Sequence, residues 1–160
     1  MKSPLANFLE ILKVLTKHEV DFIVVGGVCG VFHGAPITTF DLDILRATDE
    51  ANAPKLLGAL DELEGRSRLH QKVVKPNHGH LKARGHLLLN TRFGHLDILA
   101  TIGKGHDYDD LIQQAKTGSL QSISFRLLDL ETLIKTKEEV GRPKDLAVLP
   151  VLRATLREKG

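Results

Sequence analysis

The chain has 160 residues, the usual length of one domain, and can bury roughly two thirds of its unfolded surface. With 42% apolar and 26% charged residues it has a globular composition, and a net charge of +2 does not by itself indicate nucleic-acid binding. The single cysteine excludes an internal disulfide, no long apolar stretch suggests a signal peptide or membrane span, and the absence of Trp argues against a base-stacking platform. We therefore expect a cytoplasmic protein with no membrane contact.

The first elements alternate between helix and strand patterns. Ser3, followed by proline, marks a helix start, and apolar residues at helical spacing extend this helix over 4–17. The short apolar run 22–25 ends at two glycines and predicts a buried strand. A short packed helix over 28–32 is expected next, because a glycine and a proline follow it closely.

The middle of the chain predicts most of a sheet. A strand over 39–45 precedes a helix that Thr48 or Asp49 can cap and whose apolar face extends to about residue 63. Further strands are expected over 69–74, 85–90 and 92–100, with a polar, histidine-rich connection between the first two.

The last part of the chain becomes mainly helical. A helix over 108–115 and a short strand over 122–127 precede a helix capped by Asp129, and a break at 141–145 leads into a final helix. The predicted class is α+β, with a mixed sheet flanked by helices. We expect one domain over 1–160, with a core at about 18–127 and a C-terminal helical part at about 128–160.

Three aspartates stand out as candidate metal ligands. Asp41 and Asp43 lie one residue apart in a predicted strand, so both carboxylates point to one face, and Asp97 lies in another predicted strand. Such neighbours repel unless a cation lies between them, and oxygen-only ligands suit Mg²⁺ or Mn²⁺. Together with the earlier step Gly26-Gly27, they suggest a site for metal ions and a phosphate chain. Solvated strand ends and an ordinary tight turn would explain the same residues.

The segment from Phe22 to Ile44 resembles the signature of the DNA polymerase β-like nucleotidyltransferase superfamily. Small members of that superfamily include minimal nucleotidyltransferases and toxin-type transferases of toxin–antitoxin and phage-defence systems. The resemblance extends to Asp97 and to the helix-break-helix segment 133–146, so it covers nearly the whole chain. It implies a nucleotidyltransferase fold and a cytoplasmic enzyme that uses Mg²⁺ or Mn²⁺.

The resemblance also implies a role for each matching residue. Asp41 and Asp43 would bind two metal ions that bridge the nucleotide phosphates, and Asp97 would ligate the metal that activates the attacking hydroxyl. The implied nucleotide-binding residues are Gly26, Gly27, Thr39, Lys137, Arg142 and Lys144, and Lys135 is a further basic residue nearby. Lysines near a helix C-terminus also stabilise the helix dipole without any other role.

The implied reaction moves a nucleoside monophosphate from a nucleoside triphosphate, such as ATP, to a hydroxyl acceptor. A protein side chain, an RNA end or a small molecule would serve as the acceptor, and an antitoxin partner would control a toxin-type member. Many small relatives carry Arg four residues before the first aspartate, where this chain has Ile37. Isoleucine cannot contact phosphate, so a weak or inactive nucleotide-binding module is the alternative. A metal-dependent phosphohydrolase is a third reading.

The histidines and the cysteine receive simpler interpretations. His78, His80 and His86 lie close in sequence, but no second cysteine or metal-binding helix motif accompanies them. We expect a solvated polar loop, or a contact for an anionic acceptor, that also carries Lys75, Lys82 and Arg84. Cys29 is expected to pack as a small apolar residue.

Overall fold

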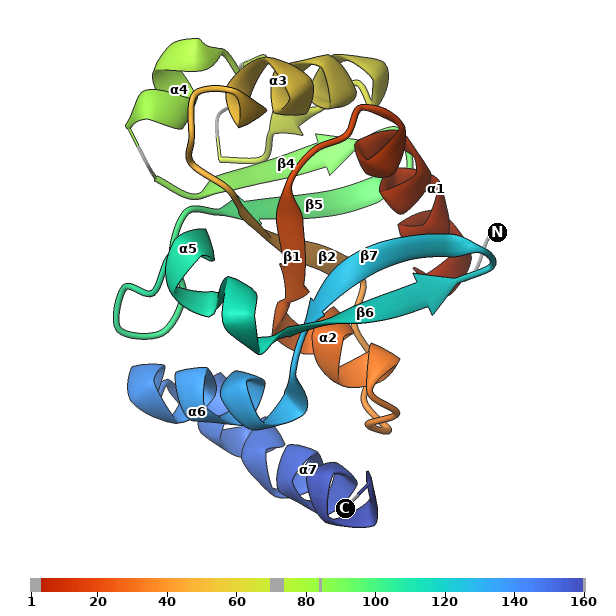
Figure 1. The fold of residues 1–160 in the computed structure, drawn as a ribbon, viewed down its shortest axis with the longest axis vertical. Coiled ribbons are helices and arrows are strands. Elements are labelled where there is room, and N and C mark those ends of the chain that lie inside the picture. Colours follow the sequence, from red (N-terminus) through yellow and green to blue (C-terminus); the bar gives the residue numbers. More distant parts are fainter. Residues whose placement is uncertain (1–3, 70–73, 84, 160) are drawn as a thin grey trace.

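A mixed sheet runs through the molecule in the computed structural model, which describes residues 4–69, 74–83 and 85–159 (Figure 1). Its strands are β1 Phe22–Val25, β2 Asp41–Arg46, β3 Arg66–Ser67, β4 Leu87–Thr91, β5 Gly94–Leu99, β6 Ala115–Leu120 and β7 Ile123–Leu128. Within the described residues the spatial order is β3-β4-β5-β2-β1-β7-β6. β2 pairs antiparallel with β1 and parallel with β5, so it lies at the centre of the sheet.

Helices cover the sheet and extend beyond it. They are α1 Pro4–Lys17, α2 Gly26–Phe32, α3 Asn52–Glu62, α4 His78–Lys82, α5 Tyr108–Leu111, a 3₁₀ turn at Ile112–Gln114, α6 Leu130–Val140 and α7 Pro143–Lys159. α6 and α7 pack against each other at one end of the molecule, and α3 and α4 lie at the opposite end (Figure 1). α2 connects β1 to the segment before β2 and contacts α6.

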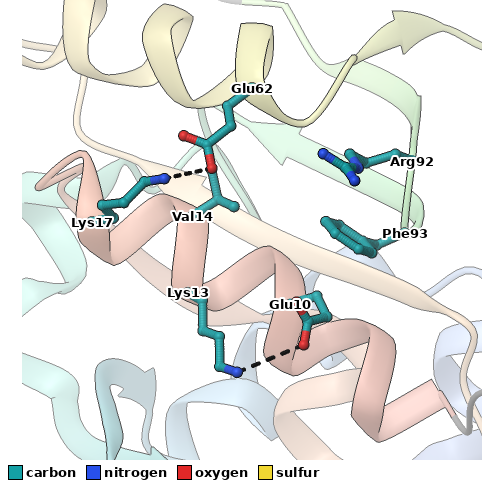
Figure 2. A pocket seen from close by; sticks show the side chains of 7 residues that line it. All are labelled: Glu10, Lys13, Val14, Lys17, Glu62, Arg92 and Phe93. Carbon is teal, nitrogen blue, oxygen red and sulfur yellow. Dashed lines mark hydrogen bonds and ion pairs between the residues drawn. The ribbon is translucent and has the colours of Figure 1, made fainter.

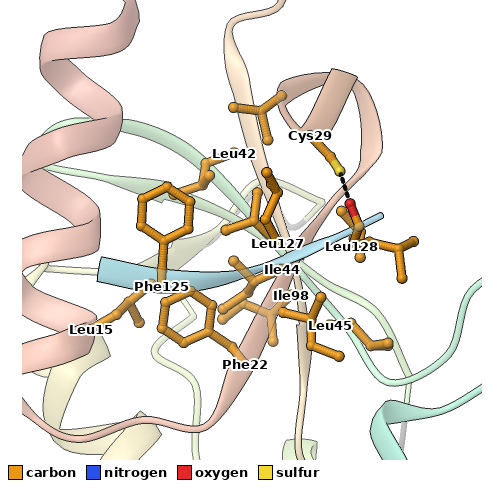
Figure 3. Close-up of a cluster of buried hydrophobic side chains, with 14 of the residues drawn as sticks. Leu15, Phe22, Cys29, Leu42, Ile44, Leu45, Ile98, Phe125, Leu127 and Leu128 are labelled. Carbon is orange, nitrogen blue, oxygen red and sulfur yellow. Dashed lines mark hydrogen bonds between the residues drawn. The ribbon is translucent and has the colours of Figure 1, made fainter. Parts of the chain in front are cut away.

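Strand alternation determines which side chains enter the core. Leu42 and Ile44 of β2 are fully buried, as are Leu96 and Ile98 of β5, and Figure 3 shows several of these side chains packed together. The residues between them therefore project from the other face of the sheet. Burial of these aliphatic side chains fixes the register of both strands, because a slip by one residue would expose them.

The α+β class and several predicted elements are confirmed. α1 and β1 have the predicted bounds, and α6 is capped as expected, since Asp129 Oδ1 accepts a hydrogen bond of 2.7 Å from the backbone N–H of Thr132. The shift to the left-handed region at Gly141 ends α6 and separates it from α7.

Other elements differ from prediction. Neither Thr48 nor Asp49 caps α3, which begins later, at Asn52. The Asn52 side chain is buried, accepts a hydrogen bond from Asp21 N at 2.8 Å and donates to Ala47 O at 2.9 Å. These bonds tie the start of α3 to the loops beside β1 and β2, so tertiary contacts rather than a cap set its boundary.

The segment predicted as a helix over 108–115 divides into α5 and the 3₁₀ turn, and Ala115 begins β6. β6 was not predicted, because its sequence Ala-Lys-Thr-Gly-Ser-Leu has little apolar alternation and its pairing with β7 forms it. The polar loop contains the short helix α4, in which the Asn77 side chain accepts from His80 N at 3.0 Å. Ser3, Arg84 and most of the predicted strand 69–74 lie outside the described residues.

Candidate functional site

The three predicted carboxylates lie on two adjacent central strands. Asp43 of β2 is directly opposite Asp97 of β5 in the parallel pairing, and Asp41 is directly opposite His95. Since directly opposed residues project to the same face, the sheet brings the three side chains together on the face away from the buried leucines and isoleucines. This juxtaposition results from register, not from sequence proximity.

The protonation of Asp43 reflects this crowding. Burial, and then the charge and close contact of Asp97 and the charge of Asp41, raise the pKa of Asp43 to about 7, while Lys137 acts in the opposite direction. An ordinary aspartate has a pKa of 3.8, so the folded protein disfavours a third negative charge at this position. A cation among the carboxylates would remove that penalty.

Each outer carboxylate contacts a basic side chain. His95 Nδ1 lies 2.9 Å from Asp41 Oδ1, and the guanidinium NH1 of Arg68 lies 2.7 Å from Asp97 Oδ1. The second contact is an ion pair without hydrogen-bond geometry, and the same nitrogen, which carries two N–H groups, donates one of them to Leu89 O at 2.8 Å. Asp97 Oδ1 is therefore buried without a hydrogen bond from any described residue.

These observations test whether the residues suit a divalent cation. As the side chains stand, no group of three or more His, Cys, Asp or Glu residues in the described ranges is arranged to hold a metal ion. The donors nevertheless have the chemistry that Mg²⁺ and Mn²⁺ prefer, because Asp41, Asp43 and Asp97 supply only carboxylate oxygens and one of these oxygens has no hydrogen bond. The residues fit a divalent ion, provided that the outer side chains turn toward it.

Gly26 makes close approach of Asp43 possible. It has a φ of 72°, in the left-handed region, and a Cβ added there would overlap Asp43 Oδ2 and lie 2.8 Å from Asp43 Cγ. Gly27 faces Thr39, whose Oγ1 would lie 3.5 Å from an added Cβ, an ordinary contact. The left-handed backbone conformation and the clash with Asp43 therefore both require glycine at position 26, whereas position 27 has room for a methyl group.

A cleft of about 550 Å³ joins Gly26 and Gly27, the first two residues of α2, which together are called the glycine turn, to the C-terminal helices. It is lined by seven of the nine predicted site residues, namely Gly26, Gly27, Thr39, Asp43, Lys137, Arg142 and Lys144. Asp41 and Asp97 are not among its lining residues, and Lys135 is exposed on α6. The cleft thus contains cationic side chains, one carboxylate of the cluster and an apolar wall.

A buried aspartate positions two of the cations. Arg142 Nε donates to Asp145 Oδ2 at 2.8 Å, and Lys137 Nζ lies 3.6 Å from Asp145 Oδ1. Burial opposes ionisation of Asp145, but the Arg142 hydrogen bond and the charges of Lys137 and Arg142 hold its pKa below the ordinary value. Sequence reasoning missed this residue, although the spacing Arg-Pro-Lys-Asp at the start of a helix is a signal for an i, i+3 pair.

Ile37 lies in the same cleft, on its apolar wall. A Cβ added to Gly30 would lie 3.2 Å from Ile37 Cδ1 and 3.0 Å from Leu152 Cδ2, so Ile37 and Leu152 of α7 meet over this glycine. Ile37 therefore contributes apolar packing at the position where the superfamily resemblance implies an arginine. Two further polar lining residues, Thr101 and Thr136, were not predicted from the sequence because no motif marks them. His86, which the sequence suggested only in connection with a polar loop, also lines the cleft.

The cysteine is part of the core. Cys29 is fully buried, and its Sγ donates to Leu128 O at 3.2 Å (Figure 3). Burial, and then the charge of Asp129, raise the pKa of the Cys29 thiol far above its ordinary value. The prediction that Cys29 packs as a small apolar residue is confirmed, and nucleophilic chemistry at this thiol is disfavoured.

A second hollow, of about 210 Å³, lies between α1, α3 and the turn after β4 (Figure 2). Four of its charged residues form pairs with one another, with Lys17 Nζ 2.6 Å from Glu62 Oε2 and Lys13 Nζ 3.6 Å from Glu10 Oε1. The Arg92 guanidinium lies over the Phe93 ring at 4.9 Å from its centroid. None of the predicted site residues lines this hollow.

Two solved structures share the architecture. TM1012 from Thermotoga maritima, a candidate nucleotidyltransferase, superposes with a TM-score of 0.59 and 19% identity over 94% of this chain and 91% of its own. The antibiotic-resistance factor ANT(2'')-Ia, an aminoglycoside nucleotidyltransferase, superposes with a TM-score of 0.61 and 13% identity over 98% of this chain and 84% of its own.

No protein-family model and no curated protein matches the chain significantly. None of the helices in the described part of the chain is long and apolar enough to cross a bilayer. At identities of 13% and 19%, the structural likeness concerns the fold, and it agrees with the resemblance found in the sequence. The chain therefore has the fold of the nucleotidyltransferases.

Proposed function

We propose that this protein is a nucleotidyltransferase that moves a nucleoside monophosphate from a nucleoside triphosphate to a hydroxyl acceptor and releases pyrophosphate. The observation that carries the proposal is the single cleft in which the Gly26-Gly27 turn and Asp43 face the cations of Lys137, Arg142 and Lys144. A polyphosphate needs both the glycine turn for close backbone approach and fixed positive charge.

The residues on the two sides of the cleft would have different roles in binding the nucleotide. The glycine turn and Thr39 hold the phosphate chain on one side of the cleft, and Lys137 and Arg142, aligned by Asp145, neutralise it on the other. Fixed charges of this kind stabilise the transition state because they need no reorganisation during phosphoryl transfer. The apolar wall with Ile37 and Leu152 would exclude water from the nucleotide.

Asp41, Asp43 and Asp97 would hold Mg²⁺ or Mn²⁺. When bound, such ions neutralise the phosphates and lower the pKa of the attacking hydroxyl. Asp97 lies on β5 directly opposite Asp43, and it would also orient the acceptor hydroxyl or accept its proton. We propose a cytoplasmic setting, with a protein side chain, an RNA end or a small hydroxylated molecule as acceptor, and an antitoxin as a partner if the protein acts as a toxin.

The experiment is incubation with each radiolabelled nucleoside triphosphate, Mg²⁺ or Mn²⁺, and a mixture of RNA and protein. Asp43→Asn should lose roughly a thousandfold in transfer rate or more, which corresponds to several kcal/mol of transition-state stabilisation, and it should stay folded. Asp49→Asn is the matched control, since Asp49 is exposed in the turn after β2. Transfer by Asp43→Asn at the unmutated rate would refute the assignment.

The second candidate is a nucleotide-binding module with little or no turnover. Two observations favour it: Ile37 stands on the cleft wall in place of a cation, and the described acidic side chains are not already arranged around a metal position. Tight binding of a triphosphate without label transfer would select this candidate. Release of free phosphate in the same assay would instead indicate a phosphohydrolase.

A further inference from the structure

Arg68 lies in line with the carboxylates across the sheet. β3 pairs with β4 so that Ser67 is opposite Leu89, and Arg68 N donates to Leu88 O at 2.8 Å, which extends this pairing by one residue. Leu88 is opposite Asp97, and Asp97 is opposite Asp43. Directly opposed residues share a face, so the register directs the Arg68 side chain over β4 toward Asp97.

The contact is close and partly buried. Arg68 NH1 lies 2.7 Å from Asp97 Oδ1, and the two side chains are only 19% and 15% exposed. The same NH1 donates to Leu89 O, which anchors the guanidinium on β4. An arginine keeps its charge at all ordinary pH values, so this positive charge beside Asp97 is permanent.

A divalent ion bound to Asp97 Oδ1 would compete with Arg68 for that oxygen. A metal bound to that oxygen would lie within a few ångströms of the guanidinium, and two positive charges so close repel strongly in a partly buried site. The same oxygen has no hydrogen-bond partner of good geometry among the described residues, so the ion pair with Arg68 is its main favourable contact. Turning the Asp97 side chain away from Arg68 is enough to release it.

We propose that Arg68 is the internal counter-ion of Asp97: it neutralises the carboxylate cluster in the metal-free protein and competes with the metal for Asp97. Arg68 thereby sets the metal concentration at which the site fills. This inference rests on the proposed function and deepens it, since it assigns a regulatory residue to the same site. Arg68 acts through Asp97 and is a positioning residue, not a catalytic one.

The first test measures Mn²⁺ binding by calorimetry with a non-hydrolysable triphosphate present. Arg68→Met removes the charge and keeps the length of the side chain, so it should bind Mn²⁺ about tenfold more tightly, the effect of one lost competing interaction. Arg66→Met is the matched control on the same strand, because Arg66 NH1 donates to Gly65 O, and it should keep the unmutated affinity. Unchanged or weaker Mn²⁺ binding by Arg68→Met overturns the inference. Weaker binding would mean that Arg68 orients the Asp97 carboxylate toward the metal.

The second test needs no metal and no activity. Without metal, Arg68→Met should lower the Tm by roughly 5 °C, because it leaves the Asp97 charge without a partner, and adding Asp97→Asn should restore most of the loss. Equal effects of Asp97→Asn in both backgrounds would overturn the counter-ion role. Arg68→Gln, which keeps a donor for Leu89 O, replaces Arg68→Met if that variant fails to fold.

The two proposals fail in different ways. If no variant transfers nucleotide but the stability coupling and the tighter Mn²⁺ binding of Arg68→Met are found, the proposed function is wrong and the counter-ion role stands. If the unmutated protein transfers nucleotide and Arg68→Met binds Mn²⁺ as the unmutated protein does, the proposed function stands and the counter-ion role is wrong.

Discussion

The carboxylate of Asp43 occupies the space into which a side chain at Gly26 would grow. An added Cβ would overlap Asp43 Oδ2 and lie 2.9 Å from Asp43 Cβ, so rotating the carboxylate alone cannot relieve the clash. Gly26 follows Val25 directly, and Val25 is opposite Asp43 in the antiparallel pairing of β1 and β2. The position of the Asp43 carboxylate and the conformation of the glycine turn thus depend on each other and form one structural unit.

Gly26→Ala should disturb that unit. The positive φ and the clash with Asp43 predict a loss of about 2–4 kcal/mol in the free energy of unfolding, measured by urea denaturation, and loss of nucleotide binding measured by calorimetry. Gly27→Ala is the stability control, because its added Cβ would make only ordinary contacts with Thr39. Equal stability of both variants would contradict the steric argument.

Asp145→Asn should weaken nucleotide binding more than turnover. Without the carboxylate, Lys137 and Arg142 lose the partner that aligns them, so we expect the KM for the triphosphate to rise about tenfold, equivalent to ~1.4 kcal/mol, with a smaller change in kcat. Glu138→Gln is the control, because it removes an exposed pair between the same two helices, with Arg153. A KM for Asp145→Asn equal to that of Glu138→Gln would show that Asp145 has no part in binding.

Ile37→Arg tests whether a missing cation limits activity. An arginine on the cleft wall would bring a guanidinium to the bound phosphates, and kcat/KM should rise about tenfold if that charge is limiting. Ile37→Met keeps an apolar side chain of similar volume and should leave kinetics unchanged while reporting the cost of lost packing against Leu152. If both variants have the same kcat/KM, the missing cation is not what limits the enzyme.

The raised pKa of Asp43 predicts a pH-dependent stability in the absence of metal. The pKa is about 7 in the folded protein against 3.8 ordinarily, so the folded state binds the proton more tightly. The stabilisation of the folded state by proton binding to Asp43 is complete below about pH 3.8 and is lost as the pH rises through 7. As the pH rises from 5 to 8, the free energy of unfolding of Asp43→Asn, measured by urea denaturation, should therefore increase by about 2.5 kcal/mol relative to that of the unmutated protein. A gap that does not change with pH would show that Asp43 titrates normally.

The lowered pKa of His33 predicts the opposite trend, a stability that falls as the pH falls. Burial, and among the charged groups Lys159 and Lys116, lower the pKa of His33 below its ordinary 6.5, although its bond to Leu128 O and the charge of Asp129 act against this. The contribution of neutral His33 to the stability of the folded state is complete above pH 6.5, and it is lost as the pH falls toward the lowered pKa of His33 in the folded protein. Replacing His33 by Gln should flatten the decline in Tm between pH 7 and pH 5.

Lys159 Nζ lies 2.7 Å from His33 Nδ1, so protonation of His33 also breaks a contact that holds the end of α7. His78→Gln is the control for the His33 variant, because His78 is exposed on α4. The same pH profile for both histidine variants would contradict the assignment to His33.

Local sequence rules determined much of this fold. Apolar spacing and caps located α1, β1 and α6, because an amphipathic face or a capping side chain acts within a few residues. Alternation along β2 correctly placed Asp41 and Asp43 on the face opposite Leu42 and Ile44, because the pleat of a strand is a local property. The superfamily resemblance agreed with the fold of the two solved structures.

Only the tertiary structure decided which distant residues meet. β6 exists because β7 supplies its hydrogen bonds, and the start of α3 follows the buried Asn52 rather than a cap. The pairing of Asp97 with Asp43, and the position of Arg68 beside Asp97, depend on strand register. These contacts join residues far apart in the chain, and they cannot be predicted from the local sequence pattern of one segment because they depend on how distant segments pair.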